Sequence, residues 1–210
     1  VRIDPGFSLN VQVLIDGVAA GAVQSLAANT VTDIEIVTGD DDNVIDISGV
    51  TSADFTVLRS IIIDAGDGND TITGTTDFAD NISGGDGNDT ITVTGGLNTL
   101  SGGDGHDIIT GGADADSIDA GDGDDNVMGN GGDDFIIGDD GNDTIDGGDG
   151  ADSIAAGNGS DQVMGGLGND TLSGDVGTDT VSGGDGDDFV YGGGGADTLT
   201  GDLGDDTMIG

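Results

Sequence analysis

The chain has 210 residues, including 45 Gly, and its 43 acidic side chains against two cationic ones give a formal net charge of −41. This charge argues against nucleic acid and anionic membranes as partners, because phosphate contacts need Lys and Arg. Cys is absent, which excludes disulfides. No run of residues reaches the roughly 20 apolar positions of a membrane span, so we expect no membrane insertion.

Residues 1–63 show the sequence pattern of short β-strands. Apolar residues at alternate positions predict half-buried strands, and turn signals at Asp16-Gly17 and Gly39-Asp40 separate them. The Ala-rich residues 18–29 predict one short helix. The first residues lack the basic and apolar stretches of a signal peptide. The alternating pairs are Val13 with Ile15, Ile34 with Ile36, Ile45 with Ile47, and Phe55 with Val57.

One segment before residue 64 resembles the array that follows it. Residues 36–46 match residues 63–73 at an offset of 27 positions, which is three repeat units. Either Asp42 or Asn43 then takes the sixth position of the repeat, and the sequence leaves this choice open. Stacked β-coils leave an open sheet edge that needs covering. We therefore interpret residues 1–63 as irregular β-coils that cap the array at 64–210.

A nine-residue phrase repeats from Ala65 onward. Residues 84–209 hold fourteen copies without insertion or deletion, and GGDGNDTIT at 84–92 is typical. Two earlier copies occupy 65–73 and 74–83, the second one residue longer. The eighth position is apolar in all fourteen copies, which predicts one inward side chain per copy. The sixth position holds Asp70, Asp80, Asp89, Asn98, Asp107, Asp116, Asp125, Asp134, Asp143, Asp152, Asp161, Asp170, Asp179, Asp188, Asp197 and Asp206.

The phrase has the chemistry of a calcium site. Gly at positions one, two and four permits positive φ and a tight turn that exposes main-chain carbonyls, and the sixth-position Asp adds a carboxylate. Calcium takes six to eight hard oxygen ligands of these kinds, whereas soft metals prefer Cys and His. The carbonyls expected to contribute include those of Gly85, Gly87, Gly103, Gly105, Gly121, Gly123, Gly148, Gly150, Gly166, Gly168, Gly184 and Gly186.

The phrase resembles G-G-x-G-x-D-x-U-x, the nonapeptide of the RTX (repeats-in-toxin) family with haemolysin-type calcium-binding repeats. The resemblance implies an all-β fold, a right-handed parallel β-roll (β-solenoid) with two nonapeptides per coil and an irregular β-helical cap. Alternate copies would lie on opposite edges, and each calcium ion would sit between two turns stacked on one edge. Roughly ten to twelve ions are implied. The weakest sites are expected between 93 and 116, where Asn98 replaces Asp and Asp114 replaces Gly.

Calcium is expected to decide whether the array folds. Stacked turns place carboxylates about 5 Å apart, where like charges repel by roughly 1 kcal/mol per pair in water. A strict period with one apolar position is not a feature of flexible linkers. Because high charge and few aromatic residues favour disorder, we expect the chain to be unfolded when calcium is removed.

The resemblance also implies a bacterial protein that leaves the cell by type I secretion and works outside the cell or at its surface. Neither His-Glu-x-x-His, nor Gly-x-Ser-x-Gly, nor a P-loop occurs, so we expect no enzymatic activity. The array runs uncapped to Gly210, which favours a rigid rod in a surface layer, adhesin or head-to-tail fibre. The alternative is a C-terminal folding and secretion module of a hydrolase or toxin. The chain lacks an initiating Met, and we expect it to be a processed product or a piece of a longer protein. Outward Thr residues also leave ice binding as an alternative.

Some outward positions carry apolar residues that suggest a contact surface. Phe135, Ile137, Phe189 and Tyr191 would face outward on one sheet, where they favour self-association into filaments or layers. Scattered exposed apolar residues are also ordinary on protein surfaces. His106 occupies a variable turn position, and we expect an exposed side chain there rather than a metal ligand.

Overall fold

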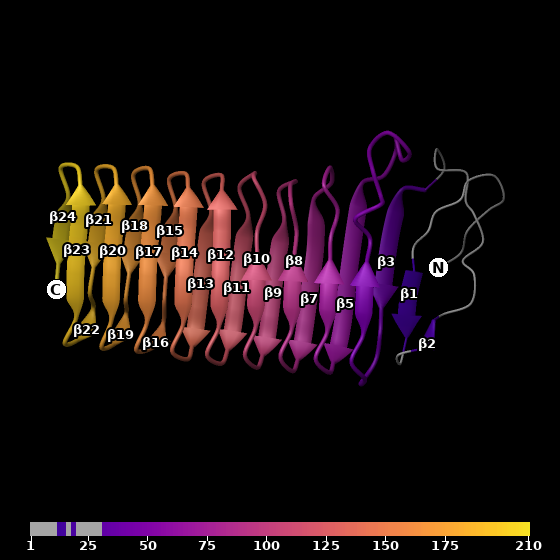
Figure 1. Ribbon diagram of the computed structural model, residues 1–210, viewed down its shortest axis with the longest axis horizontal. Helices are drawn as coiled ribbons and strands as arrows, with labels where there is room; N and C mark the ends of the chain where they lie inside the picture. Colours follow the sequence, from indigo (N-terminus) through magenta and orange to yellow (C-terminus); the bar gives the residue numbers. More distant parts are fainter. Residues whose placement is uncertain (1–11, 16–17, 20–30) are drawn as a thin grey trace.

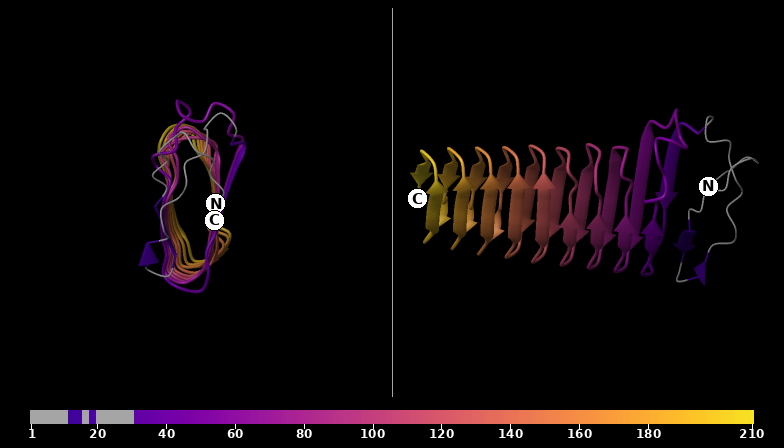
Figure 2. Two further views of the ribbon diagram at one scale, coloured as in Figure 1. Left: turned by 90° about the vertical axis from the view of Figure 1, so that its right-hand side faces the viewer. Right: turned by 45° about the horizontal axis from the view of Figure 1, so that its top comes forward.

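The computed structural model describes residues 12–15, 18–19 and 31–210, and these form strands and turns without a helix. The chain winds into a flattened tube whose two long walls are β-sheets (Figure 1). The tube is seen end-on in Figure 2. None of the residues described forms a helix with the length and apolar character that crossing a membrane requires. The all-β solenoid predicted from the repeat is confirmed.

The two sheets take alternate strands of the chain, and we name them sheet A and sheet B. Sheet A has the order β2 (Val18–Ala19), β1 (Gln12–Ile15), β4 (Val44–Asp46), β6 (Thr71–Thr73), β8 (Thr90–Thr92), β10 (Ile108–Thr110), β12 (Asn126–Gly131), β14 (Thr144–Asp149), β17 (Gln162–Leu167), β20 (Thr180–Asp185) and β23 (Thr198–Leu203). Sheet B has the order β3 (Asp33–Val37), β5 (Ser60–Asp67), β7 (Asp80–Asp86), β9 (Thr99–Asp104), β11 (Ser117–Asp122), β13 (Phe135–Asp140), β15 (Ser153–Ala155), β18 (Thr171–Ser173), β21 (Phe189–Tyr191) and β24 (Thr207–Ile209). Three short strands form a side branch of sheet B, in which β16 (Asn158–Gly159) pairs with β13, β19 (Val176–Gly177) with β16, and β22 (Gly194–Gly195) with β19.

The register shows that two nonapeptides make one coil. Ile109 of β10 pairs in parallel with Ile91 of β8 and with Val127 of β12, each 18 residues away. The longer copy at 74–83 shifts the pairing of Ile72 with Ile91 to 19 residues. Equivalent positions therefore stack along the whole tube.

The core is a single seam of eighth-position side chains between the sheets. These residues are fully buried from Ile91 to Val190, and the exposed fraction of each is at most 2%. The first position of each copy also faces inward, which the sequence pattern did not reveal, and its few side chains, such as Ala120, Ala156 and Val93, are buried. Gly at most first positions leaves room for the sixth-position side chains at both ends of the seam.

The N-terminal residues follow the sequence expectations only in part. The offset of 27 is confirmed, because Ile36 pairs with Ile63 and Ile45 with Ile72 in parallel. In contrast, β1 pairs antiparallel with β2 and β4, so it is not a coil of the solenoid.

The strand predicted at Phe55–Val57 is wrong, since these residues lie in a segment of turns, from which Phe55 is buried in the core. The helix predicted at 18–29 is contradicted at Val18–Ala19, which is a strand. The rest of that segment and the Asp16-Gly17 turn lie outside the described residues.

Candidate metal sites on the two edges of the solenoid

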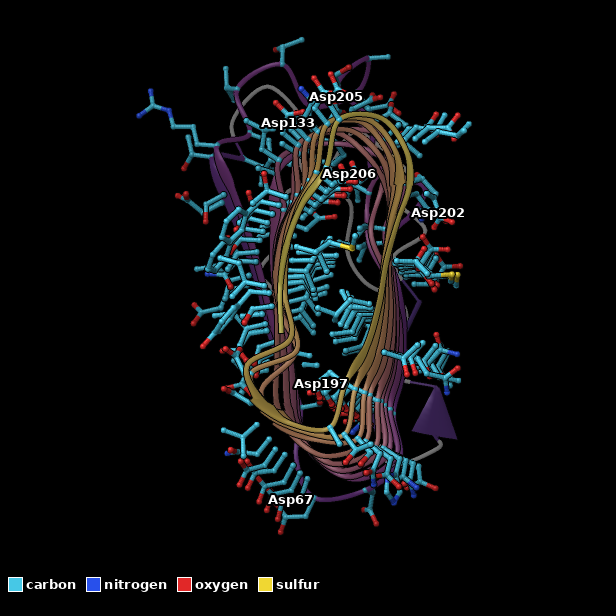
Figure 3. All side chains as sticks on the ribbon, turned by 90° about the vertical axis from the view of Figure 1, so that its left-hand side faces the viewer. Asp67, Asp133, Asp197, Asp202, Asp205 and Asp206 are labelled. Carbon is cyan, nitrogen blue, oxygen red and sulfur yellow. The ribbon has the colours of Figure 1, made fainter. Side chains whose placement is uncertain are left out.

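The sixth-position side chains form two rows inside the turns at opposite edges of the tube. Figure 3 shows Asp197 and Asp206 inside opposite ends of the flattened tube, whereas Asp67 and Asp133 lie outside. We name the rows by one member each. The Asp89 edge contains Asp70, Asp89, Asp107, Asp125, Asp143, Asp161, Asp179 and Asp197; the Asn98 edge contains Asp80, Asn98, Asp116, Asp134, Asp152, Asp170, Asp188 and Asp206. All except the half-buried Asp197 and Asp206 are at most 4% exposed.

Hydrogen bonds link each row from coil to coil. The main-chain N–H of Asp125 donates to Oδ1 of Asp143 at 2.9 Å, and the same bond recurs along both edges at 2.6–3.1 Å. Each Oδ1 is thereby fixed by the residue one coil earlier. Asn43 precedes the members of the Asp89 edge, and its N–H donates to Oδ1 of Asp70. Asn43, which is buried, therefore takes the sixth position, while Asp42 is exposed and accepts the N–H of Asn69.

The second carboxylate oxygen of most members is buried without a hydrogen-bond donor. An unpaired buried carboxylate is costly unless a cation or a donor compensates it. A Cβ placed on Gly174 would lie 2.7 Å from Oδ2 of Asp179 and 2.8 Å from the carbonyl oxygen of Gly192 in the next coil. The carboxylate and this carbonyl thus converge on one small space. The unpartnered oxygens are Oδ2 of Asp70, Asp89, Asp107, Asp125, Asp134, Asp143, Asp152, Asp161, Asp170, Asp179 and Asp188.

The glycines at positions two and four supply the rest of the turn. All twelve named from the sequence have φ between 102° and 152°, a region that strongly favours Gly. A Cβ on Gly123 would collide with the carbonyl oxygen of Gly105 in the preceding coil. Within the part of the chain that the structure describes, no three His, Cys, Asp or Glu side chains form a metal-binding group. A cation on either edge would therefore take several of its ligands from main-chain carbonyls.

Burial raises the pKa of several carboxyl groups on both edges. Desolvation raises the pKa of Asp134 and Asp143 to about 7, although a main-chain N–H bonded to each carboxylate lowers it and neighbouring carboxylates on the same edge raise it. The pKa of Asp89, Asp107 and Asp170 is raised to about 6, and desolvation by burial is the largest cause. Paired carboxylates, carbonyls and a deficit of positive charge fit a hard divalent cation such as calcium.

The fifth-position side chains form a further ladder that sequence reasoning missed. On the outside of the Asp89 edge, Oδ1 of Asn88 accepts the N–H of His106, and Nδ1 of His106 accepts the N–H of Asp124, both at 2.8 Å. Oδ1 of Asp124 in turn accepts the N–H of Asn142. The frequent Asn and Asp at position five were the available signal. His106 is exposed and belongs to this ladder, outside the carboxylate row.

Three members of the Asn98 edge differ from the rest. Both oxygens of Asp80 and of Asp116 have hydrogen-bond donors from the chain. Because Oδ1 of Asp116 accepts the N–H of Asn98 whereas Oδ2 accepts that of Gly112, neither oxygen is left without a partner. Asn98 replaces a carboxylate oxygen with an amide nitrogen. These three turns are the place where the sequence departs most from the phrase.

The sequence of the array matches one family model. The model described as RTX calcium-binding nonapeptide repeat (4 copies) matches residues 62–77, 74–109, 92–127, 101–136, 119–154, 137–172 and 173–208. These segments cover 62–208 without a gap, which is more than half of the chain. A search of curated proteins found no match. Repeats of this kind bind calcium and are typical of secreted bacterial proteins. The chain belongs to the family of RTX calcium-binding nonapeptide repeat proteins.

Proposed function

We propose that the chain is a secreted, non-enzymatic structural rod whose folding is driven by extracellular calcium. The observation that carries the proposal is the pair of rows of buried carboxylates, most of which keep one oxygen without a donor. Such rows disfavour the folded state until a cation joins consecutive turns. At ten times its dissociation constant, each bound ion adds about 1.4 kcal/mol to the free energy of unfolding.

The sixth-position carboxylates and the carbonyls of the Gly-rich turns would hold the ions. Bound calcium supplies positive charge between carboxylates that otherwise repel one another, and roughly ten to twelve ions correspond to the gaps between stacked turns. The chain's own part is to hold each carboxylate in place, through the N–H of the preceding coil, and to exclude water from its second oxygen.

The structural role is supported by the continuous sheets and by an apolar surface on sheet B. Phe135 and Phe189 are 49% and 41% exposed and share one row, separated by Ser153 and Thr171. Ile137 and Tyr191 share the neighbouring row of the same face. Aromatic side chains with small residues between them favour contact with a second copy, which would build filaments or layers outside the cell.

Calcium titration tests the folding part of the proposal. Far-ultraviolet circular dichroism should show an unfolded chain in chelator and a β-rich one in millimolar calcium. Magnesium at the same concentration is the matched control, since it prefers water and rigid octahedral geometry and should support little folding. Identical spectra in chelator and in calcium would refute calcium-driven folding.

Sedimentation and electron microscopy test the structural role. In calcium, the wild type should form assemblies, whereas Phe135→Ser with Phe189→Ser should remain monomeric with an unchanged circular dichroism spectrum. Ile108→Ser, on the opposite sheet and 45% exposed, is the matched control and should assemble like the wild type. A wild type that is a monodisperse monomer in calcium would contradict self-association but not calcium-driven folding.

A further inference from the structure

The backbone of the Asn98 edge changes part of the way along the tube. In sheet A, β6, β8 and β10 have three residues each, whereas β12, β14, β17, β20 and β23 have six. The three short strands lead into the turns that hold Asp80, Asn98 and Asp116. These turns therefore follow a different path from the later turns on the same edge.

In the first of these turns, hydrogen bonds from the chain satisfy the carboxylate of Asp80. The N–H of Thr75 donates to its Oδ2 at 2.6 Å, and the hydroxyl of Thr75 lies 3.1 Å from both oxygens. Thr75 is fully buried. A Cβ on Gly74 would lie 2.8 Å from a methyl carbon of Val93, so an apolar group occupies the space beside this turn.

The equivalent space in a later coil is polar. At Gly183, which begins the turn of Asp188 on the same edge, a Cβ would lie the same 2.8 Å from the carbonyl oxygen of Gly201, which is a ligand of the kind that calcium takes. A valine methyl group cannot act as such a ligand. The Asp80 turn thus lacks the free carboxylate oxygen of the later turns, and a methyl group takes the place beside Gly74 that a carbonyl oxygen has beside Gly183.

In the second turn, the side-chain amide of Asn98 lies among oxygens. Its Nδ2 is 2.9 Å from the carbonyl oxygen of Gly96, 3.4 Å from that of Gly95 and 2.8 Å from Oδ1 of Asp116. Two carbonyls and a carboxylate are the oxygen types that a calcium ion would recruit. Here an N–H₂ group, which carries two protons and no acceptor, meets them instead.

In the third turn, the N–H of Gly112 donates to Oδ2 of Asp116 at 2.7 Å, and Oδ1 accepts from both nitrogens of Asn98 at 2.8 Å. The carboxylate of Asp114, at a position that is Gly in most copies, accepts the N–H of Gly96 in the turn before it. The carboxylate and amide groups of these turns thus find partners within the chain itself.

We infer that hydrogen bonds replace calcium in the three turns that carry Asp80, Asn98 and Asp116, with the Nδ2 amide group of Asn98 standing in for an ion. Calcium then binds along the Asp89 edge and, on the Asn98 edge, only from Asp134 onward. The inference rests on the proposed calcium-driven folding. It also removes Asp80 and Asp116 from the ligands expected from the sequence.

Counting bound calcium in three proteins tests the inference. Mass spectrometry of the metal content after desalting, with calorimetric titration beside it, gives the number of ions per chain. Asn98→Asp places a negative oxygen among the carbonyls of Gly95 and Gly96 and should bind one more ion than the wild type. Asn81→Asp makes the same change at an exposed position of β7, where the Asn side chain has no hydrogen-bond partner among the described residues, and it should bind the wild-type number. Equal numbers in all three proteins would overturn the inference, whereas a wild type without calcium would overturn the proposed function instead.

A measurement on the wild type avoids dependence on the folding of a variant. In calcium-saturated protein, the side-chain N–H₂ protons of Asn98 should exchange slowly with solvent, because the group is buried and donates to fixed oxygens. The N–H₂ of the exposed Asn81 should exchange rapidly and is the internal control. Rapid exchange at Asn98 in the saturated protein would contradict the inference.

Discussion

The main-chain N–H of Asp107 donates to Oδ1 of Asp125, 18 residues later, at 2.7 Å, while Oδ2 of Asp125 is buried without a donor. One oxygen of the same carboxylate is therefore used to join two coils, and the other is left to a cation. This division explains why a side chain that costs free energy to bury is placed in every coil of the rod.

Asp125→Asn should separate these two roles. The amide can still accept the N–H of Asp107 through its oxygen, but its nitrogen cannot bind calcium. In saturating calcium, we expect the variant to lose one or two ions and about 1–3 kcal/mol in the free energy of unfolding, measured by urea denaturation. Without calcium, it should be no less stable than the wild type, because it removes a carboxylate whose pKa burial raises. Asp122→Asn, exposed in the same turn, is the matched control and should change neither quantity.

Gly123→Ala should disrupt the turn itself. Gly123 has φ of 145°, and a Cβ there would collide with the carbonyl oxygen of Gly105. Backbone strain and steric overlap each cost about 1–3 kcal/mol, so urea denaturation in calcium should show a loss of at least about 2 kcal/mol. At Gly49 a Cβ would meet nothing within 4 Å, and Gly49→Ala should be nearly neutral. Equal stability of the two variants would contradict this account of the turn.

Two adjacent isoleucines allow a sharp test of the core. Ile109 is fully buried in the seam, whereas Ile108 is 45% exposed on the outer face of the same strand. Ile109→Ala should lower the free energy of unfolding in calcium by about 2–5 kcal/mol, and Ile108→Ala by well under half of that. If Ile108→Ala were the more harmful change, the assignment of inward and outward positions would be wrong.

The raised pKa values predict opposite pH dependences with and without calcium. A carboxyl group whose pKa rises on folding binds more protons in the folded state, so stability without calcium should fall as the pH rises from about 4 to about 7. Because Asp134 and Asp143 have pKa values of about 7, the folded chain without calcium should be most populated at the acidic end of this window. Circular dichroism in calcium-free buffer from pH 4 to 8 measures this.

The same groups make protons and calcium compete. The calcium affinity of the folded chain should decrease as the pH falls from about 7 to about 6, and calcium binding to chains that are already folded at pH 6 should release protons. Calorimetric titrations in two buffers with different ionisation enthalpies detect this release. A binding enthalpy that does not depend on the buffer would show that the carboxylates are already ionised in the calcium-free chain.

Much of the fold could be predicted from the sequence because the repeat encodes it locally. The eighth position predicted the buried seam, for example Ile136 and Ile145, and the resemblance to the RTX nonapeptide implied two copies per coil, which is the register of 18. Predictions were poorer where the period is absent. Phe55 and Val57 alternate as in a strand but lie in turns, because packing of the loop on the core decided the conformation there.

The sequence by itself determined the repeat and its array of carboxylates and Gly-rich turns, and the resemblance of this repeat to the RTX nonapeptide implied the fold class and the type of ion. The tertiary structure decided how each oxygen is used. It placed Asn43, rather than Asp42, in the carboxylate row. It also showed that Thr75 and Gly112 donate to Asp80 and Asp116, so the same residue type has a free oxygen in one coil and none in another. The physical reason is that a hydrogen-bond partner depends on the path of the neighbouring backbone, which a position in a repeat does not specify.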